Sequence, residues 1–237
     1  MSHALVMDRS GNAVLVFTSL SNGRQGPGGF WSMGVLLETQ DDGQDDGQAE
    51  LPALAIDDQG TATAVWQQND TIFFPNLIVT RRVTASRLVP GQPWTAPVDI
   101  DFATGSGANG TSLNIHVTGG TPTTASPVGS VAINDAGVAL LTLRRLPSVP
   151  NNVFVARCTP GTGWAAPDFL ALNGDAARVL LAPDGSAVVA WDAVSGNSIY
   201  AVRGTAAGVW GAPSLVGGGF GTQIVPRCCG QPDAGVQ

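Results

Sequence analysis

One phrase occurs four times in the chain: a glycine, any residue, an alanine, any three residues and then a large apolar residue. The copies run from Gly11 to Phe17, from Gly60 to Trp66, from Gly137 to Leu143 and from Gly185 to Trp191. Their glycines lie 49, 77 and 48 residues apart. Repetition at this spacing predicts an architecture built by copying one supersecondary unit.

Each copy follows a short apolar run and a polar turn. The runs occupy residues 5–7, 54–56, 131–133 and 179–181, and the turns occupy residues 8–11, 57–60, 134–137 and 183–185. Asp, Asn and Gly suit a chain reversal, so each unit is expected to open with a β-hairpin. The phrase itself is apolar at successive positions, which indicates a second strand that is covered on both faces.

Two further strands follow in three of the units. A third strand ends on an arginine, and we interpret Arg81, Arg157 and Arg203 as occupying one repeated position. A fourth strand is marked by Trp-x-x-Pro at Trp94, Trp164 and Trp210, and unit one has only a degenerate version at Trp31. Proline suits a strand with one unpaired edge.

The predicted fold is therefore all-β: a β-propeller with about four blades of four antiparallel strands in this chain. A β-sandwich would not repeat its sequence at a fixed period, and a solenoid coil is shorter than these units. The prediction is one domain over residues 1–237, with units at 3–50, 51–127, 128–173 and 174–217 and an irregular tail at 218–237. Four units leave open whether the ring closes alone, in a homo-oligomer or with additional blades.

The hairpin phrase, the arginine strand and the Gly-x-Trp-x-x-Pro ending together resemble the repeat of bacterial secreted or surface β-propeller proteins. Lectin propellers and sialidase-like propellers are more distant in appearance, because the sialidase Asp-box is matched only at its centre, around Asp58 and Asp135. The resemblance implies a propeller on the cell surface or outside the cell. No room for a signal peptide precedes the first predicted strand, so an exported protein would be a mature segment or a fragment.

Composition excludes several classes of function. The formal net charge of −7 disfavours nucleic acid as a partner, and no apolar stretch is long enough to span a membrane. No nucleophile elbow, zinc helix or phosphate loop occurs, so we expect no catalytic residue, metal or cofactor. Two questions stay open: whether the loop with Asp41, Asp42, Asp45 and Asp46 binds Ca²⁺, and whether Cys158 pairs with Cys228 or Cys229.

The leading functional hypothesis is a non-enzymatic module that binds a protein or glycan through loops at residues 18–29, 41–48 and 103–127. Deletion of residues 103–127 is expected to abolish binding and leave the fold intact. A lectin with sites between blades would use Arg81, Arg157, Arg203, Trp94, Trp164 and Trp210 as ligand contacts, although all six follow the period of the repeat, which favours a scaffold role. Two further hypotheses are a sialidase-like glycosidase and a fragment of a larger propeller protein.

Overall fold

The computed structural model describes residues 3–17, 35–37, 48–72, 78–106, 113–117, 131–147, 152–193 and 198–218. Every regular element in these ranges is a β-strand, which confirms the all-β prediction. Among them, no helix is long and apolar enough to cross a membrane.

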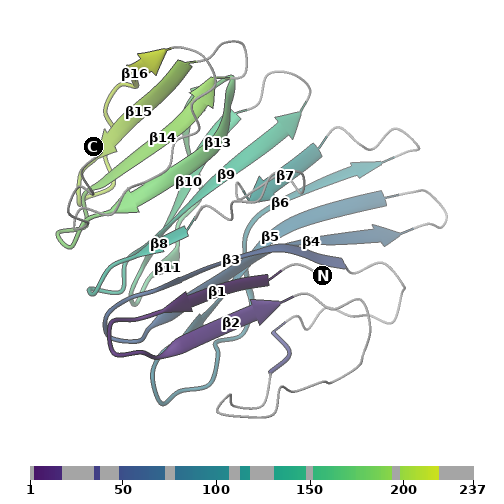
Figure 1. The fold of residues 1–237 in the computed structure, drawn as a ribbon. Helices are drawn as coiled ribbons and strands as arrows, with labels where there is room; N and C mark the ends of the chain where they lie inside the picture. The colour runs from purple at the N-terminus through teal and green to yellow at the C-terminus, as the bar shows by residue number, and fades with distance from the viewer. Residues whose placement is uncertain are drawn as a thin grey trace, which may run out of the picture.

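The strands form four antiparallel sheets in chain order (Figure 1). The first sheet holds β1 (His3–Met7) and β2 (Ala13–Phe17). The second holds β3 (Gln48–Ile56), β4 (Ala62–Ile72), β5 (Ile78–Leu88) and β6 (Val98–Ser106). The third holds β7 (Leu113–Val117), β8 (Val131–Ile133), β9 (Ala139–Pro147), β10 (Asn152–Thr159), β11 (Gly163–Trp164) and β12 (Asp168–Leu172). The fourth holds β13 (Gly174–Leu181), β14 (Ala187–Ala193), β15 (Ser198–Gly204) and β16 (Ser214–Gly218).

The first hairpin of every sheet has the predicted turn. The side-chain oxygen of the first turn residue accepts the backbone N–H four residues later at Asp8 (2.8 Å), Asp57 (2.7 Å) and Asn134 (3.0 Å). The turn glycines have φ of 86°, 81°, 73° and 84° at Gly11, Gly60, Gly137 and Gly185. Glycine reaches this left-handed conformation without the penalty that a side chain imposes, so its repetition has a steric cause.

The sheets stack face to face, so that each has a forward face toward the next sheet and a rear face toward the preceding one. The large apolar residue of the repeated phrase lies on the rear face, where Trp66, Leu143 and Trp191 are 3%, 0% and 2% exposed. Three apolar clusters fill the spaces between successive sheets. Full burial of such side chains contributes about 1.5–3 kcal/mol each. In the third sheet Leu140 and Leu141, on opposite faces, are both fully buried, as the apolar pattern predicts.

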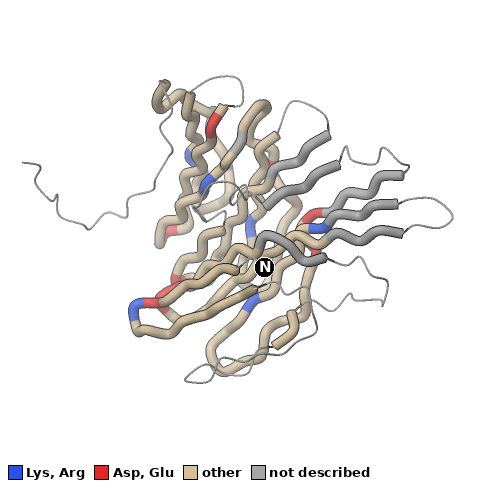
Figure 2. Tube along the Cα trace, turned by 45° about the vertical axis from the view of Figure 1, so that its right-hand side comes forward, with Lys and Arg blue, Asp and Glu red and all other residues tan. Residues whose placement is uncertain are grey.

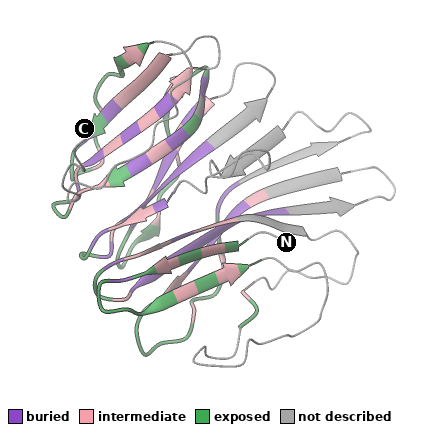
Figure 3. Ribbon diagram, viewed as in Figure 1, coloured by how far each residue is buried: buried purple, intermediate pink, exposed green. Residues whose placement is uncertain are grey.

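The two ends of the stack differ from the interior. The inner strands β1, β3, β8 and β13 lie one beside the next, and the stack runs from β2 at one end to the fourth sheet at the other (Figure 1). The outward sides of these end sheets carry exposed and half-buried residues (Figure 3). The described strands thus form a series of four sheets, and no closed ring is present among them.

The expectation that deletion of residues 103–127 leaves the fold intact is wrong, because part of this segment belongs to two sheets. Strand β6 extends to Ser106 and pairs with β5 over residues 78–81. Strand β7 pairs with β9 from Leu113 opposite Pro147 to Val117 opposite Leu143. Deletion of residues 103–127 would therefore remove ladder hydrogen bonds from two sheets instead of sparing the fold.

Several predicted features lie outside the described residues: Trp31, the loop at residues 18–29, the acidic loop at Asp41, Asp42, Asp45 and Asp46, and the pair Cys228 and Cys229. Cys158, which is described, carries a free and buried thiol.

Candidate binding site

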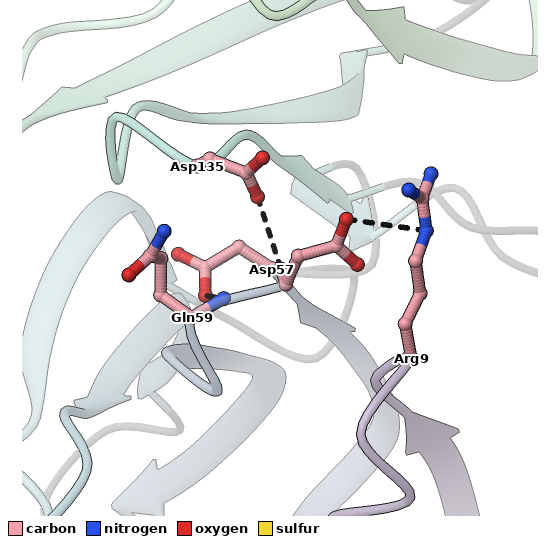
Figure 4. A network of polar contacts seen from close by, with 5 residues as sticks. Arg9, Asp57, Gln59 and Asp135 are labelled. Carbon is pink, nitrogen blue, oxygen red and sulfur yellow. Dashed lines mark hydrogen bonds and ion pairs between the residues drawn. The ribbon is translucent and has the colours of Figure 1, made fainter.

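The turns of the four first hairpins meet at one end of the inner strands and contact one another in chain order. From the first turn, Arg9 forms an ion pair with Asp58 (Nε to Oδ2, 3.2 Å). The N–H of Asp58 in turn donates to Oδ1 of Asp135 in the third turn (3.0 Å; Figure 4). The amide of Asn134 donates to the backbone oxygens of Ala182 (3.1 Å) and Pro183 (3.3 Å) in the fourth sheet.

A pocket of about 180 Å³ opens where the second, third and fourth turns converge. Its polar wall is made of Asp57, Asp58, Asn134 and Asp135. Its apolar wall is made of Ile56, Ile133, Leu181 and Pro183, which end the inner strands or follow them. Drug-sized sites occupy about 300–1,000 Å³, so this pocket suits one small chemical group.

The two oxygens of the Asp57 carboxylate differ in their hydrogen bonds. Oδ1 of Asp57 accepts the N–H groups of Gln59 (3.0 Å) and Thr61 (2.7 Å), which shapes the turn. Oδ2 of the same carboxylate is buried and has no hydrogen-bond partner among the described residues. Leaving a buried acceptor unsatisfied costs about 1–3 kcal/mol.

Acidic and basic residues lie side by side at the turn end of the first hairpins, and other charged residues lie along the strands (Figure 2). The described lining of the pocket combines three carboxylates with an apolar wall and includes no aromatic side chain. In the part of the chain that the structure describes, no group of three or more His, Cys, Asp or Glu residues is arranged to hold a metal ion. The carboxylates of the pocket are suited to accept hydrogen bonds from donors and cationic groups.

The register of the arginines differs from the sequence prediction. Opposite β9 and β14, Arg157 pairs with Leu140 and Arg203 with Val188, each one residue after the alanine of the repeated phrase. The residue at this position in the second sheet is Arg87, opposite Thr63, whereas Arg81 pairs with Asn69 further along the strand. The prediction that Arg81 occupies the repeated position is wrong. Strand β5 is 11 residues long, and Arg81 lies near its beginning, whereas the repeated position lies near its end.

Arg87 and Arg157 each connect their sheet to the next one. Nη1 of Arg87 donates to the backbone oxygen of Gly137 (2.8 Å). Arg157 donates to the backbone oxygens of Gly185 (3.3 Å from Nη2) and Ala206 (2.8 Å). In both cases an acceptor is the turn glycine of the following sheet. We call this contact the arginine clamp.

The three tryptophans of Trp-x-x-Pro also lie between sheets. Trp94 packs against the cluster between the first and second sheets, Trp164 against the next cluster and Trp210 against the last. Each is half-buried. These contacts give the tryptophans a scaffold role, and a ligand contact by the six predicted residues stays a prediction.

Cys158 lies beside the first arginine clamp. Burial raises the pKa of the Cys158 thiol, and this effect outweighs the opposing influence of the nearby Arg87. Nucleophilic attack requires the thiolate, so the protonated and buried thiol is unsuited to catalysis.

Sequence reasoning missed Arg87 and the pocket residues Asp57, Asp58 and Asp135. A signal for Arg87 was present, because Arg87, Arg157 and Arg203 all stand seven residues before the Trp of their unit. The aspartates were assigned to turns, which is correct, but only the stacking of sheets brings those turns together.

No protein-family model matches the chain, and the curated proteins contain no match. Among solved structures, the chain is similar to a Hadza microbial sialidase, Hz136, with a TM-score of 0.45 and 13% sequence identity. The similarity covers 71% of this chain and 34% of the sialidase, so the chain spans about a third of that protein's length.

Proposed function

We propose that the four sheets are blades of a β-propeller and that the protein is a non-enzymatic binding module. Its ligand is a protein partner that inserts a basic side chain into the pocket between the first-hairpin turns. The observation that carries the proposal is the lining of the pocket, where three aspartates stand beside an apolar wall and Oδ2 of Asp57 lacks a donor among the described residues.

The two walls of the pocket favour a basic side chain over other small groups. Lysine and arginine have an apolar stem below a charged head, which matches Ile133 and Leu181 beside Asp57 and Asp135. Charge-assisted hydrogen bonds to carboxylates are about twice as strong as neutral ones. The net charge of −7 adds attraction for a basic partner.

A glycan would also offer donors, through its hydroxyl groups. Sugar rings, however, gain from an aromatic surface, and no aromatic residue is among the described residues that line this pocket. Glycosidase chemistry needs two carboxylates with separate acid and base or nucleophile roles. Here Asp58 is bound to Arg9 and Asp135 accepts a backbone N–H, so both have structural roles.

The proposal is tested by titrating the protein separately with N-acetyl-arginine amide and with a short basic peptide. Calorimetry or NMR measures the binding in each titration. We expect the peptide to bind, and Asp57→Asn to weaken its binding by at least about tenfold. Asparagine keeps the oxygen that Gln59 and Thr61 require but places an NH₂ group at the position of Oδ2, which reverses the polarity of the pocket. Binding should weaken with salt, because the carboxylates of Asp58 and Asp135 are exposed to solvent ions.

Asp184→Asn is the matched control. Asp184 occupies the turn of the fourth sheet and accepts the N–H of Ser186 (2.8 Å), but it does not line the pocket. Equal losses for both variants, or binding of neutral glycans in preference to the peptide, would overturn the choice of ligand. Hydrolysis of a fluorogenic sialoside that Asp57→Asn abolishes would overturn the non-enzymatic function itself.

For location, we propose the cell surface or the outside of a bacterium, on the likeness of the repeat to secreted and surface propellers. Fractionation of the source cells with an antibody to the protein tests this, and recovery in the cytoplasm alone would contradict it.

A further inference from the structure

The rear face of the first sheet is apolar and open. Leu5, Met7, Leu15 and Phe17 are 59%, 67%, 37% and 50% exposed. Phe17 ends the first copy of the repeated phrase, so it is the counterpart of Trp66, Leu143 and Trp191, which are at most 3% exposed. The same position is thus buried wherever a described sheet precedes it and open where none does.

The forward face of the fourth sheet has no described sheet against it; its apolar residues are half-buried or exposed, and it also carries Arg178 and Asp192. It presents Val188, Ala190, Ala201 and Arg203, at positions where the third sheet presents Leu140, Thr142, Val155 and Arg157. Leu140, Thr142 and Val155 are at most 2% exposed because the fourth sheet covers them. Arg203 is exposed, and in the described part of the chain its guanidinium has no hydrogen-bond partner.

The interior junctions show how such faces fit together. At each of the two junctions after the second and third sheets, an arginine of the forward face donates to the turn glycine of the following rear face, Arg87 to Gly137 and Arg157 to Gly185. The first sheet carries the corresponding glycine, Gly11, with the same left-handed φ of 86°. The carbonyl oxygen of Gly11 is therefore the counterpart of those of Gly137 and Gly185, which each accept a hydrogen bond from an arginine.

We propose that the open forward face of the fourth sheet docks against the open rear face of the first sheet in a second copy of the chain. Arg203 of one copy then donates to the carbonyl of Gly11 in the other, and Phe17 becomes buried as Trp191 is. The contact is heterologous, because two different faces meet. The two end faces of the chain correspond to the forward and rear faces that pack together at its interior junctions. This correspondence favours a second copy of the chain over an unrelated partner.

The test is the mass of the 237-residue chain in solution, measured by light scattering and sedimentation over a range of concentrations. We expect association into a complex of two or more copies. Phe17→Asp should weaken association by at least about a hundredfold, because it places a charge in an apolar junction. Arg203→Ala should weaken it by roughly ten- to a hundredfold, the range for a hydrogen bond from a charged donor. Val209→Asp, at an exposed position in the turn before Trp210, is the control and should leave the mass unchanged.

Complementation distinguishes this junction from a symmetric one. Phe17→Asp disrupts only the rear face of the first sheet, and Val188→Asp disrupts only the forward face of the fourth sheet. Each variant alone should be monomeric, with an unchanged circular dichroism spectrum, while an equimolar mixture should form a dimer through the one intact junction. A monomeric wild-type chain at all concentrations would overturn the proposal, and so would a mixture that stays monomeric.

Discussion

Trp191→Ala is expected to lower the free energy of unfolding by about 3–5 kcal/mol, the range for truncating a fully buried aromatic side chain. Phe17→Ala, at the same position of the repeated phrase, is expected to lower it by about 1 kcal/mol or less, because half of the Phe17 side chain is already exposed. The difference arises from the neighbouring sheet, which covers Trp191 and not Phe17.

Urea unfolding followed by tryptophan fluorescence and circular dichroism measures both values. The protein concentration should be low enough to keep the chain monomeric, since association would stabilise the folded state. Equal losses for the two variants would show that Phe17 is covered within the monomer, which contradicts the described stack.

Gly137→Ala has the second large effect, an expected loss of about 2–4 kcal/mol. The left-handed φ of 73° costs a residue with a side chain roughly 1–2 kcal/mol. In addition, a Cβ at this position would collide with Nη2 of Arg87 and lie 3.2 Å from Cγ of Pro160. The collision would displace the guanidinium and break its 2.8 Å bond to the carbonyl of Gly137.

Gly11→Ala provides the control for backbone strain alone. Gly11 has φ of 86°, and a Cβ there would meet no atom within 4 Å. We expect a loss of about 1–2 kcal/mol from the left-handed backbone. The difference between Gly137→Ala and Gly11→Ala, measured by the same unfolding experiment, reports the arginine clamp together with the close contact to Pro160. No difference would mean that the clamp does not contribute to stability.

Local signals in the sequence were sufficient for the hairpins. Hydrophobic runs and a glycine at the end of each turn act within a few residues, and the structure confirms them at all four copies; the Asp or Asn at the start of the turn is present in the first three. The alternation of faces also followed from the phrase, because side chains of a strand point to opposite sides in turn.

The register between strands was harder to predict than the hairpins. Counting from the start of the third strand points to Arg81, whereas the sheet register places Arg87 opposite Thr63, the position that repeats. In all three units the N–H after the Trp donates to the carbonyl of the true repeated arginine, for example from Thr95 to Arg87 (2.8 Å). Counting backwards from the Trp would have found it.

The pocket could not be predicted from single units. Asp57 and Asp135 are 78 residues apart, and each is explained locally by its own turn. They meet because the inner strands β3, β8 and β13 lie side by side, which places the turns at one end. Proximity of this kind depends on how the sheets stack and leaves no trace in a short window of sequence.

Under the proposed function, the ligand binds in the pocket and the repeated arginines hold the sheets together. Peptide binding and urea stability measured side by side for Asp57→Asn and Arg157→Ala separate these two roles. We expect Asp57→Asn to lose at least about tenfold in affinity with little change in stability. We expect Arg157→Ala to lose about 1.5–3 kcal/mol of stability and to bind as the wild type does, at temperatures where it is folded. The opposite pattern, with affinity lost only in Arg157→Ala, would overturn both roles and place the ligand between the sheets.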